Sequence, residues 1–130
     1  MGCGAYMRIV NNSSRAVTTA VTSPHCLYDH GTEGSNPGFF NGLTIPAFTT
    51  RPAEGPGQYI KAKTTGACFF ASSTFTLVID GLNILADSLR FTDSNKKWSC
   101  AGQPYNIDVA ISNVRQQAEI VITLSDHSIQ

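Results

Sequence analysis

Apolar and polar side chains alternate in short runs along most of this chain, and this alternation is the strongest constraint on its fold. The segment 74–79, TFTLVI, is typical, with Phe75, Leu77 and Ile79 on alternate positions. Neighbouring side chains of a β-strand point to opposite faces, whereas an amphipathic helix repeats at every third and fourth position. The period therefore predicts an all-β protein, an antiparallel β-sandwich of about eight or nine strands.

Turn-forming residues bound the expected strands. Asp80-Gly81 favours the tight turn of a β-hairpin, and Pro46 indicates an edge strand because proline cannot donate to a ladder. We expect the first two strands to form a hairpin, the fourth and fifth to form another, and 92–103 to be a polar connection. The expected strands are 5–10, 15–22, 43–49, 58–64, 67–71, 74–79, 83–91, 105–112 and 119–124.

Length and charge limit the possible functions. At 130 residues the chain is expected to be a single domain, residues 1–130. Charged residues make up 14% of it, and the formal net charge is +0. A neutral chain has no general attraction to phosphate backbones, so we expect no nucleic-acid partner. No run approaches the roughly 18 apolar residues that a membrane-spanning helix needs, so no transmembrane segment is expected.

Four cysteines, at positions 3, 26, 68 and 100, are widely spaced. None of them forms the Cys-x-x-Cys pair that a zinc or redox site would offer, so we expect neither a metal nor another cofactor. An even number of cysteines and a weakly charged surface suit an oxidising compartment. The sequence predicts a secreted protein with at least one disulfide, and three pairings are possible if all four cysteines pair.

Catalytic motifs are not recognisable in the sequence. The Gly-x-Ser-x-Gly elbow of serine hydrolases is missing. His25, Cys26, Asp29 and His30 bring imidazole, thiol and carboxylate together within the long irregular segment 23–41. A metal site or a Cys/His pair assembled there is the enzymatic alternative, and a purely structural loop is the interpretation that we favour.

Aromatic side chains near the expected loops are the main candidates for a binding site. Trp98 lies beside two lysines, and amphipathic rings next to lysine suit stacking on sugars or contact with lipid headgroups. The alternative is that several of these rings cap the ends of the core. The candidate ligand-binding residues are Trp98, Lys96, Lys97, Tyr28, Phe39, Phe40, Tyr59 and Tyr105.

The order of several segments resembles the aegerolysin family of small β-sandwich proteins that recognise membrane lipids. The matching segments are RIVNNS at 8–13, QYIKA at 58–62, TFTLV at 74–78, Trp98 with Cys100, and IVITL at 120–124. The resemblance implies a β-sandwich fold and lipid recognition without catalysis.

We therefore expect a non-enzymatic protein that binds membrane lipid and acts in defence or as a toxin. Pore formation, as a homo-oligomer or with a partner protein at the membrane, is part of that expectation. The alternative is a secreted lectin that binds a cell-surface glycan, or an effector that docks on a host protein through the loop 23–41.

Overall fold

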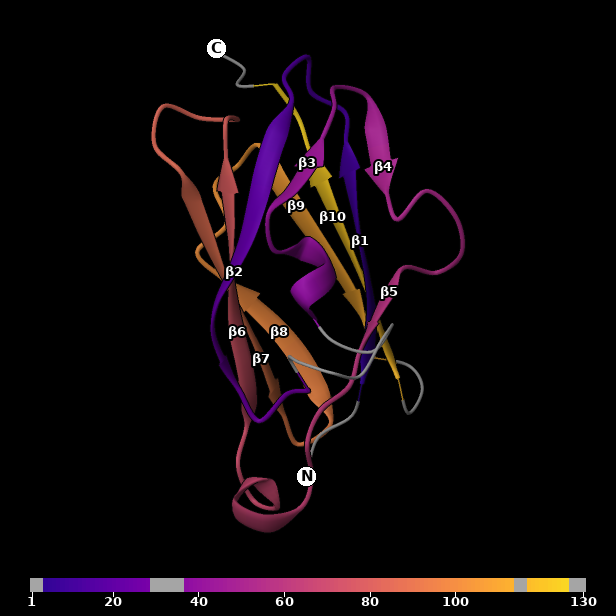
Figure 1. The fold of residues 1–130 in the computed structure, drawn as a ribbon, viewed down its shortest axis with the longest axis vertical. Coiled ribbons are helices and arrows are strands. Elements are labelled where there is room, and N and C mark those ends of the chain that lie inside the picture. The colour runs from indigo at the N-terminus through magenta and orange to yellow at the C-terminus, as the bar shows by residue number, and fades with distance from the viewer. Residues whose placement is uncertain (1–3, 29–36, 114–116, 127–130) are drawn as a thin grey trace.

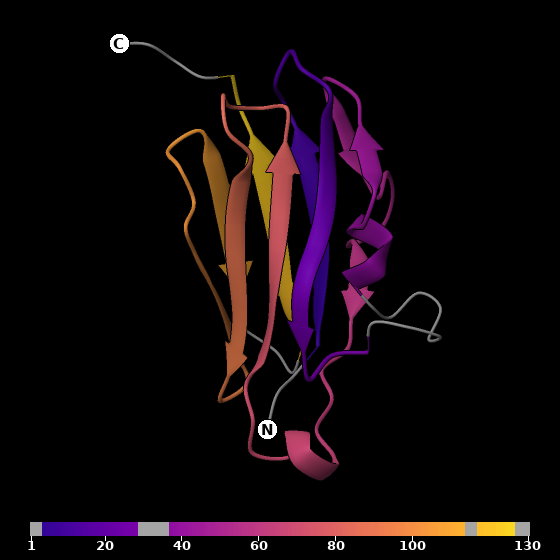
Figure 2. The ribbon, with the colours of Figure 1, turned by 60° about the vertical axis from the view of Figure 1, so that its left-hand side comes forward.

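Two five-stranded β-sheets pack face to face in the computed structural model, which describes residues 4–28, 37–113 and 117–126 (Figures 1 and 2). This arrangement confirms the prediction of an all-β sandwich. These described residues form ten strands, where the sequence predicted eight or nine, and two short 3-10 helices.

The first sheet has the order β4-β1-β10-β9, and β5 pairs with β1 beside β4. Strands β1 and β10 run parallel along their whole length, and the other pairs of this sheet are antiparallel. One pair thus departs from the antiparallel prediction, because segments at opposite ends of a chain need no tight turn and can pair in either direction. The bounds are β1 Ala5–Asn11, β4 Thr49–Arg51, β5 Gln58–Ile60, β9 Ile107–Ser112 and β10 Ala118–Leu124.

The second sheet has the order β3-β2-β6-β7-β8, and all of its pairs are antiparallel. The edge position predicted from Pro46 is confirmed, because β3 ends just before this proline and borders the sheet. The bounds are β2 Val17–His25, β3 Leu43–Ile45, β6 Ser73–Asp80, β7 Asp87–Ser94 and β8 Lys97–Ala101.

The predicted N-terminal hairpin is wrong, because β1 and β2 belong to different sheets. Both strands bury alternate side chains in the common core, so the connection 12–16 crosses from one sheet to the other. Likewise, the predicted strand 43–49 is divided between β3 and β4, and the chain changes sheets at Pro46. Alternation identifies strands, but it does not say which sheet each strand joins.

The predicted hairpin of 58–64 with 67–71 is also wrong. Strand β5 ends at Ile60, and the 3-10 helix η2 occupies Gly66–Cys68. Conversely, the expected polar connection 92–103 contains β8. Asn95 and Lys96 form the two-residue turn before β8 with φ values of 53° and 64°, a conformation for which glycine is the usual signal.

The core lies between the sheets and follows the predicted alternation. In β6 the buried positions are Phe75, Leu77 and Ile79, and Phe75 stacks on Phe91 of β7 with ring centroids 5.1 Å apart. The other 3-10 helix, η1 (Pro37–Phe40), places the fully buried ring of Phe40 in this core. One continuous apolar layer therefore holds the two sheets together. Any binding or catalytic site must lie at the two ends of the sandwich or on its outer faces.

We name the two ends by what they carry (Figure 1). The disulfide end, at the bottom of the view, contains η2, residues 61–72, residues 26–28 and the β7–β8 turn at 95–96. The pocket end, at the top, contains the connections 12–16, 81–86 and 102–106.

Candidate functional site

The aromatic and lysine residues predicted to form one binding site do not gather at one place. Tyr28, Lys96 and Lys97 lie at the disulfide end, whereas Tyr105 lines a pocket at the opposite end. Tyr59 lies on the outside of the first sheet, where its ring is 5.0 Å from that of Tyr6. The structure thus divides the predicted site between two ends and one face.

Trp98 is not available to a ligand, and the prediction that it faces one is wrong. Its side chain is 3% exposed and lies 6.0 Å from the Phe75 ring in the core. Its backbone N–H donates to Asn113 Oδ1, and the Asn113 amide donates back to the Trp98 carbonyl. Strand β8 directs the indole inward because Lys97 and Ser99, on either side, occupy the outer face.

Of the neighbouring residues Phe39 and Phe40, one side chain is buried and the other is partly exposed. Phe40 is fully buried, which contradicts its assignment to a binding surface, whereas Phe39 is 40% exposed and packs edge-on against it. Residues 29–36 of the segment 23–41, including Asp29 and His30, lie outside the described residues. Its assignment as a docking loop stays a prediction.

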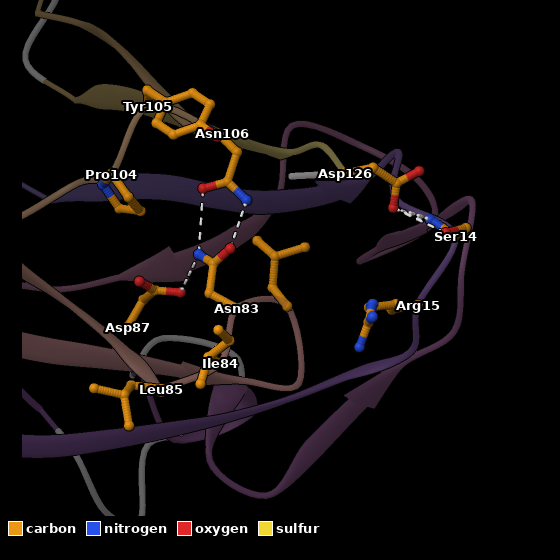
Figure 3. Close-up of a pocket in the computed structure, with 11 residues that line it drawn as sticks. Ser14, Arg15, Asn83, Ile84, Leu85, Asp87, Pro104, Tyr105, Asn106 and Asp126 are labelled. Carbon is orange, nitrogen blue, oxygen red and sulfur yellow. Dashed lines mark hydrogen bonds between the residues drawn. The ribbon is translucent and has the colours of Figure 1, made fainter. Parts of the chain in front are cut away.

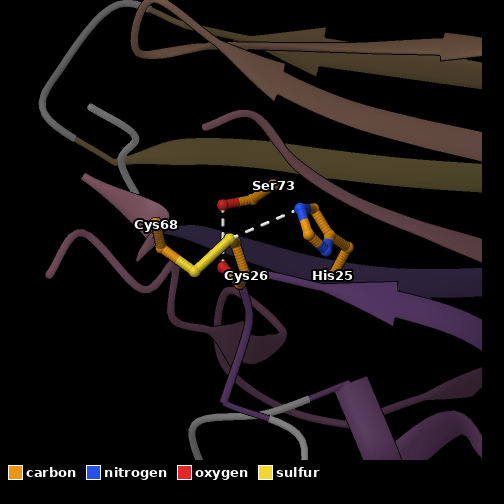
Figure 4. The surroundings of a disulfide bond; sticks show 4 residues. All are labelled: His25, Cys26, Cys68 and Ser73. Atoms are coloured by element: carbon orange, nitrogen blue, oxygen red, sulfur yellow. Dashed lines mark hydrogen bonds between the residues drawn. A yellow bond between two sulfur atoms is a disulfide. The ribbon is translucent and has the colours of Figure 1, made fainter. Parts of the chain in front are cut away.

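A disulfide between Cys26 and Cys68 braces the disulfide end and confirms the prediction of at least one such bond (Figure 4). Ser73 Oγ donates to the Cys26 carbonyl at 2.8 Å, and His25 Nε2 lies 3.6 Å from Cys26 Sγ. Because Cys26 is oxidised, it has no thiolate to act as a nucleophile, and the Cys/His pair that was the enzymatic alternative for this segment is not formed with Cys26.

Two consecutive phenylalanines project from this braced end. Phe70 is 91% exposed and Phe69 is 44% exposed, and their rings meet edge-on with centroids 4.5 Å apart. They follow directly after Cys68, whose bond to Cys26 ties their turn to the end of β2. Large apolar side chains are thus held out in solvent by a covalently fixed segment.

Lysines lie at the same end of the sandwich as the phenylalanine pair. The segment 26–28 runs antiparallel to 61–63, and Lys61 Nζ and Lys63 Nζ each lie 5.3 Å from the Tyr28 ring centroid. Exposed Lys96 and Lys97 lie at the β7–β8 turn of the same end. These four are all of the lysines in the chain.

The pocket end holds an open cavity of about 900 Å³ between the connections 81–86 and 102–106 (Figure 3). Asn83 and Asn106 join the two connections through reciprocal amide hydrogen bonds of 3.2 and 2.9 Å. Asn83 Nδ2 also donates to Asp87 Oδ2 at 2.8 Å, and Asn106 Nδ2 donates to the Ser125 carbonyl. This network fixes the polar floor of the pocket.

A second polar group of the pocket is formed by Ser14, Arg15 and Asp126. The backbone N–H and the hydroxyl of Ser14 both donate to Asp126 Oδ1, each at 2.9 Å. These two hydrogen bonds, with a smaller contribution from the Arg15 charge, lower the pKa of the Asp126 carboxyl below its usual value. Asp126 is therefore ionised at neutral pH.

The remaining wall of the pocket is apolar. Leu82 is buried beneath it, whereas the side chains of Ile84 and Leu85 are exposed and Tyr105 is 70% exposed. Gly81 lets this loop approach the β1–β2 connection, because a Cβ there would lie 2.9 Å from the Ala16 carbonyl oxygen. The result is an amphipathic pocket, in which apolar side chains and the polar groups of Asn83, Asn106 and Asp87 lie side by side (Figure 3).

Other chemistry is sparse in the described part of the chain. No group of three or more His, Cys, Asp or Glu side chains there could hold a metal ion. Cys100 carries a free thiol whose pKa is raised to about 11 by burial, so it is protonated and unreactive at neutral pH. No helix among the described residues is long and apolar enough to cross a membrane.

Sequence reasoning missed two exposed pairs of apolar residues because it assigned them to strands. Phe69-Phe70 and Ile84-Leu85 are adjacent pairs, and adjacent side chains of a strand point to opposite faces. That break in the alternation was a usable signal of a loop. No comparable signal identified the contacts of Asn83 with Asn106 or of Ser14 with Asp126, because these partners are 23 and 112 residues apart in the sequence.

No family model matches this chain, and no curated protein matches it in sequence. The two ends are therefore interpreted from their own chemistry.

Proposed function

We propose that this is a non-enzymatic protein that binds membrane surfaces through its disulfide end. The observation that carries the proposal is the phenylalanine pair, with Phe70 91% and Phe69 44% exposed on a segment fixed by a disulfide. Exposed apolar groups of this size are costly in water, and they mark interaction sites in soluble proteins. A rigid projecting tip loses little conformational entropy when it enters the headgroup boundary.

The lysines add a preference for anionic lipid. The chain has a formal net charge of +0, yet all four of its lysines lie at the disulfide end. Four of the acidic residues, Asp80, Asp87, Asp108 and Asp126, lie at or next to the pocket end. Asp93 and Glu119 lie toward the disulfide end and Arg15 lies at the pocket end, so the separation is partial. We propose that the remaining excess of lysine orients the molecule with the phenylalanine tip toward a negative surface.

The phenylalanine rings and the lysines make contributions of comparable size to the free energy of membrane binding. Full burial of one phenylalanine side chain is worth roughly 1.5 to 3 kcal/mol, and a lysine near an anionic membrane contributes about 1 kcal/mol. Two rings and a few lysines suffice for reversible binding at the surface. They do not suffice for insertion across the bilayer.

We extend the proposal to the biological setting. A disulfide that closes a long loop is typical of secreted proteins, so we propose that the protein is secreted and acts on cells from outside. A defence or toxin role, with pore formation as a homo-oligomer or with a partner protein, follows from the resemblance to aegerolysins. It requires that membrane binding be demonstrated first.

Vesicle co-sedimentation tests the membrane proposal. We expect binding to vesicles of phosphatidylcholine with phosphatidylserine, and weaker binding to phosphatidylcholine alone or with sphingomyelin and cholesterol. Phe70→Ala should lower the partition coefficient about tenfold or more. The matched control is Phe48→Ala, because Phe48 is 71% exposed and its N–H contacts Ser13 at the pocket end. Failure to bind any of these vesicles, or equal losses in Phe70→Ala and Phe48→Ala, would overturn the proposal.

A separate variant tests how much the lysines contribute to membrane binding. Lys96→Gly removes one charge, and it also relieves the left-handed backbone at Lys96. Binding to phosphatidylserine vesicles should nevertheless weaken about fivefold at low salt. Arg15→Gln removes a positive charge at the pocket end and should leave this binding unchanged. If both variants weaken binding equally, the orientation proposed above is wrong.

A further inference from the structure

We propose that the pocket end is a second binding site, which takes a short neutral saccharide. This inference is independent of membrane binding, because it uses residues at the other end of the sandwich. Its basis is the combination of an apolar wall and fixed hydrogen-bonding groups in one cavity of about 900 Å³. A cavity of this size is in the range of small-ligand sites.

Tyr105 offers the surface on which a sugar ring can stack. Its side chain is 70% exposed on the rim of the pocket, and Leu85, 78% exposed, lines the same pocket on the other side of the Asn83–Asn106 pair (Figure 3). One face of a pyranose presents mainly C–H groups, which pack well on an aromatic ring. A flat amphipathic ligand is therefore a better fit than a branched aliphatic one.

The polar side supplies acceptors and donors for sugar hydroxyls. Asp87 Oδ2 accepts from Asn83, which leaves Oδ1 to accept a ligand hydroxyl, and Arg15 brings guanidinium donors to the same pocket. The Asn83–Asn106 pair saturates its amide N–H groups within the protein and so holds Asp87 in place. Preformed groups of this kind lower the entropy cost of binding a weakly held ligand.

Charge selects a neutral ligand. Two carboxylates, Asp87 and Asp126, and one guanidinium, Arg15, line the pocket. Asp126 is kept ionised by its hydrogen bonds from Ser14. The pocket therefore disfavours phosphate, sulfated sugars and sialylated sugars, whose negative charge would face an excess of carboxylate.

The test is a titration of the full chain with saccharides, in which binding is measured by ligand-observed NMR. The probes are glucose, galactose, mannose and N-acetylglucosamine, each as monomer and as linked di- and trisaccharides, with sialyllactose and inorganic phosphate as anionic probes. We expect at least one neutral probe to bind. Tyr105→Ala should weaken its binding about tenfold, and Tyr105→Phe should retain it.

Two matched control variants distinguish binding at this pocket from nonspecific binding to exposed aromatic rings. Phe48→Ala removes an exposed ring at the same end but outside the pocket, and Phe70→Ala removes the tip of the disulfide end. Both should leave saccharide affinity unchanged, whereas Asp87→Asn should weaken it several-fold. The proposal is overturned if no neutral probe binds, if sialyllactose or phosphate binds instead, or if Tyr105→Ala and Asp87→Asn bind like the original protein. None of these results bears on vesicle binding, which is measured separately.

Discussion

The two ends of this sandwich each expose a pair of adjacent apolar residues, but different polar groups surround the pairs. Phe69-Phe70 is accompanied by the four lysines, whereas Ile84-Leu85 borders a pocket of amides and carboxylates. The phenylalanine pair projects at the end that carries the lysines, and this combination suits a broad anionic surface. The Ile84-Leu85 pair lies beside fixed hydrogen-bond acceptors, and this combination suits a small ligand with hydroxyl groups. A formal net charge of +0 conceals this polarity, because it averages over both ends.

The ends also differ in what holds them together. At the disulfide end, a covalent bond joins residues 42 positions apart. At the pocket end, hydrogen bonds among Asn83, Asn106, Asp87 and the Ser125 carbonyl join two connections, the start of β7 and the residue that follows β10. A covalent brace is insensitive to pH and lost on reduction, whereas a hydrogen-bond network responds to the ionisation of its members. The two ends should therefore fail under different conditions.

Removal of the disulfide should have the largest effect. The double variant Cys26→Ala/Cys68→Ala should lower the free energy of unfolding by about 4 kcal/mol, because the bond closes a loop of roughly 43 residues in the unfolded chain. Chemical denaturation measures this loss. Cys100→Ala is the control, since Cys100 is a free, half-buried thiol, and it should cost much less.

The same double variant tests the comparison of the ends. Under conditions where it remains folded, vesicle binding should weaken because the phenylalanine tip is no longer fixed. Saccharide binding at the pocket end should change little. Equal loss of both activities would show that the two ends are not independent.

The Asn83–Asn106 pair should give the next largest effect. Asn106 is 5% exposed and forms three of the hydrogen bonds described above, so Asn106→Ala should cost about 1 to 3 kcal/mol of stability by leaving buried partners unsatisfied. Asn83→Ala should cost less, because Asn83 is only half-buried. A double-mutant cycle should show a coupling of at least about 0.5 kcal/mol.

Additive costs in that cycle would mean that the two amides stabilise their loops separately. Vesicle binding serves as the second measurement, since neither variant touches the disulfide end. A loss of vesicle binding in Asn106→Ala beyond its unfolded fraction would contradict the division of the molecule into two sites.

The core could be predicted from the sequence, and the two ends could not. Alternation identified Phe75, Leu77 and Ile79 as inward-facing because burial repeats with the strand period. It failed at β8, where Trp98 is the one large buried residue and where Asn95 and Lys96 make a hairpin turn without glycine. Proximity of Trp98 to two lysines in the sequence suggested a shared surface, but side chains on either side of a strand residue face away from it.

The candidate sites depend on contacts that the sequence does not encode locally. Ser14 meets Asp126 across 112 positions, and Asn83 meets Asn106 across 23. The Ser14–Asp126 contact exists because β1 and β10 pair in parallel, so that the residues following each of these strands lie at the same end of the sandwich. A local pattern could flag Phe69-Phe70 and Ile84-Leu85 as loop residues, but it could not place them at opposite ends.

The smallest predicted effect is a dependence on acid that is confined to the pocket end. The folded-state pKa of Asp126 lies below the ordinary value of 3.8, first because of the Ser14 backbone N–H and then because of the Ser14 hydroxyl. A lowered folded-state pKa stabilises the folded protein at pH values above the unfolded-state pKa, and that contribution is lost as the pH falls through the folded-state pKa. We therefore expect the Ser14 amide to lose protection from hydrogen exchange below about pH 4, while amides beside the disulfide keep theirs. Ser14→Ala removes one donor and should move the Asp126 pKa, followed by NMR, back toward 3.8. Simultaneous loss of protection at both ends would show that acid unfolds the whole sandwich and that the pocket end has no separate response.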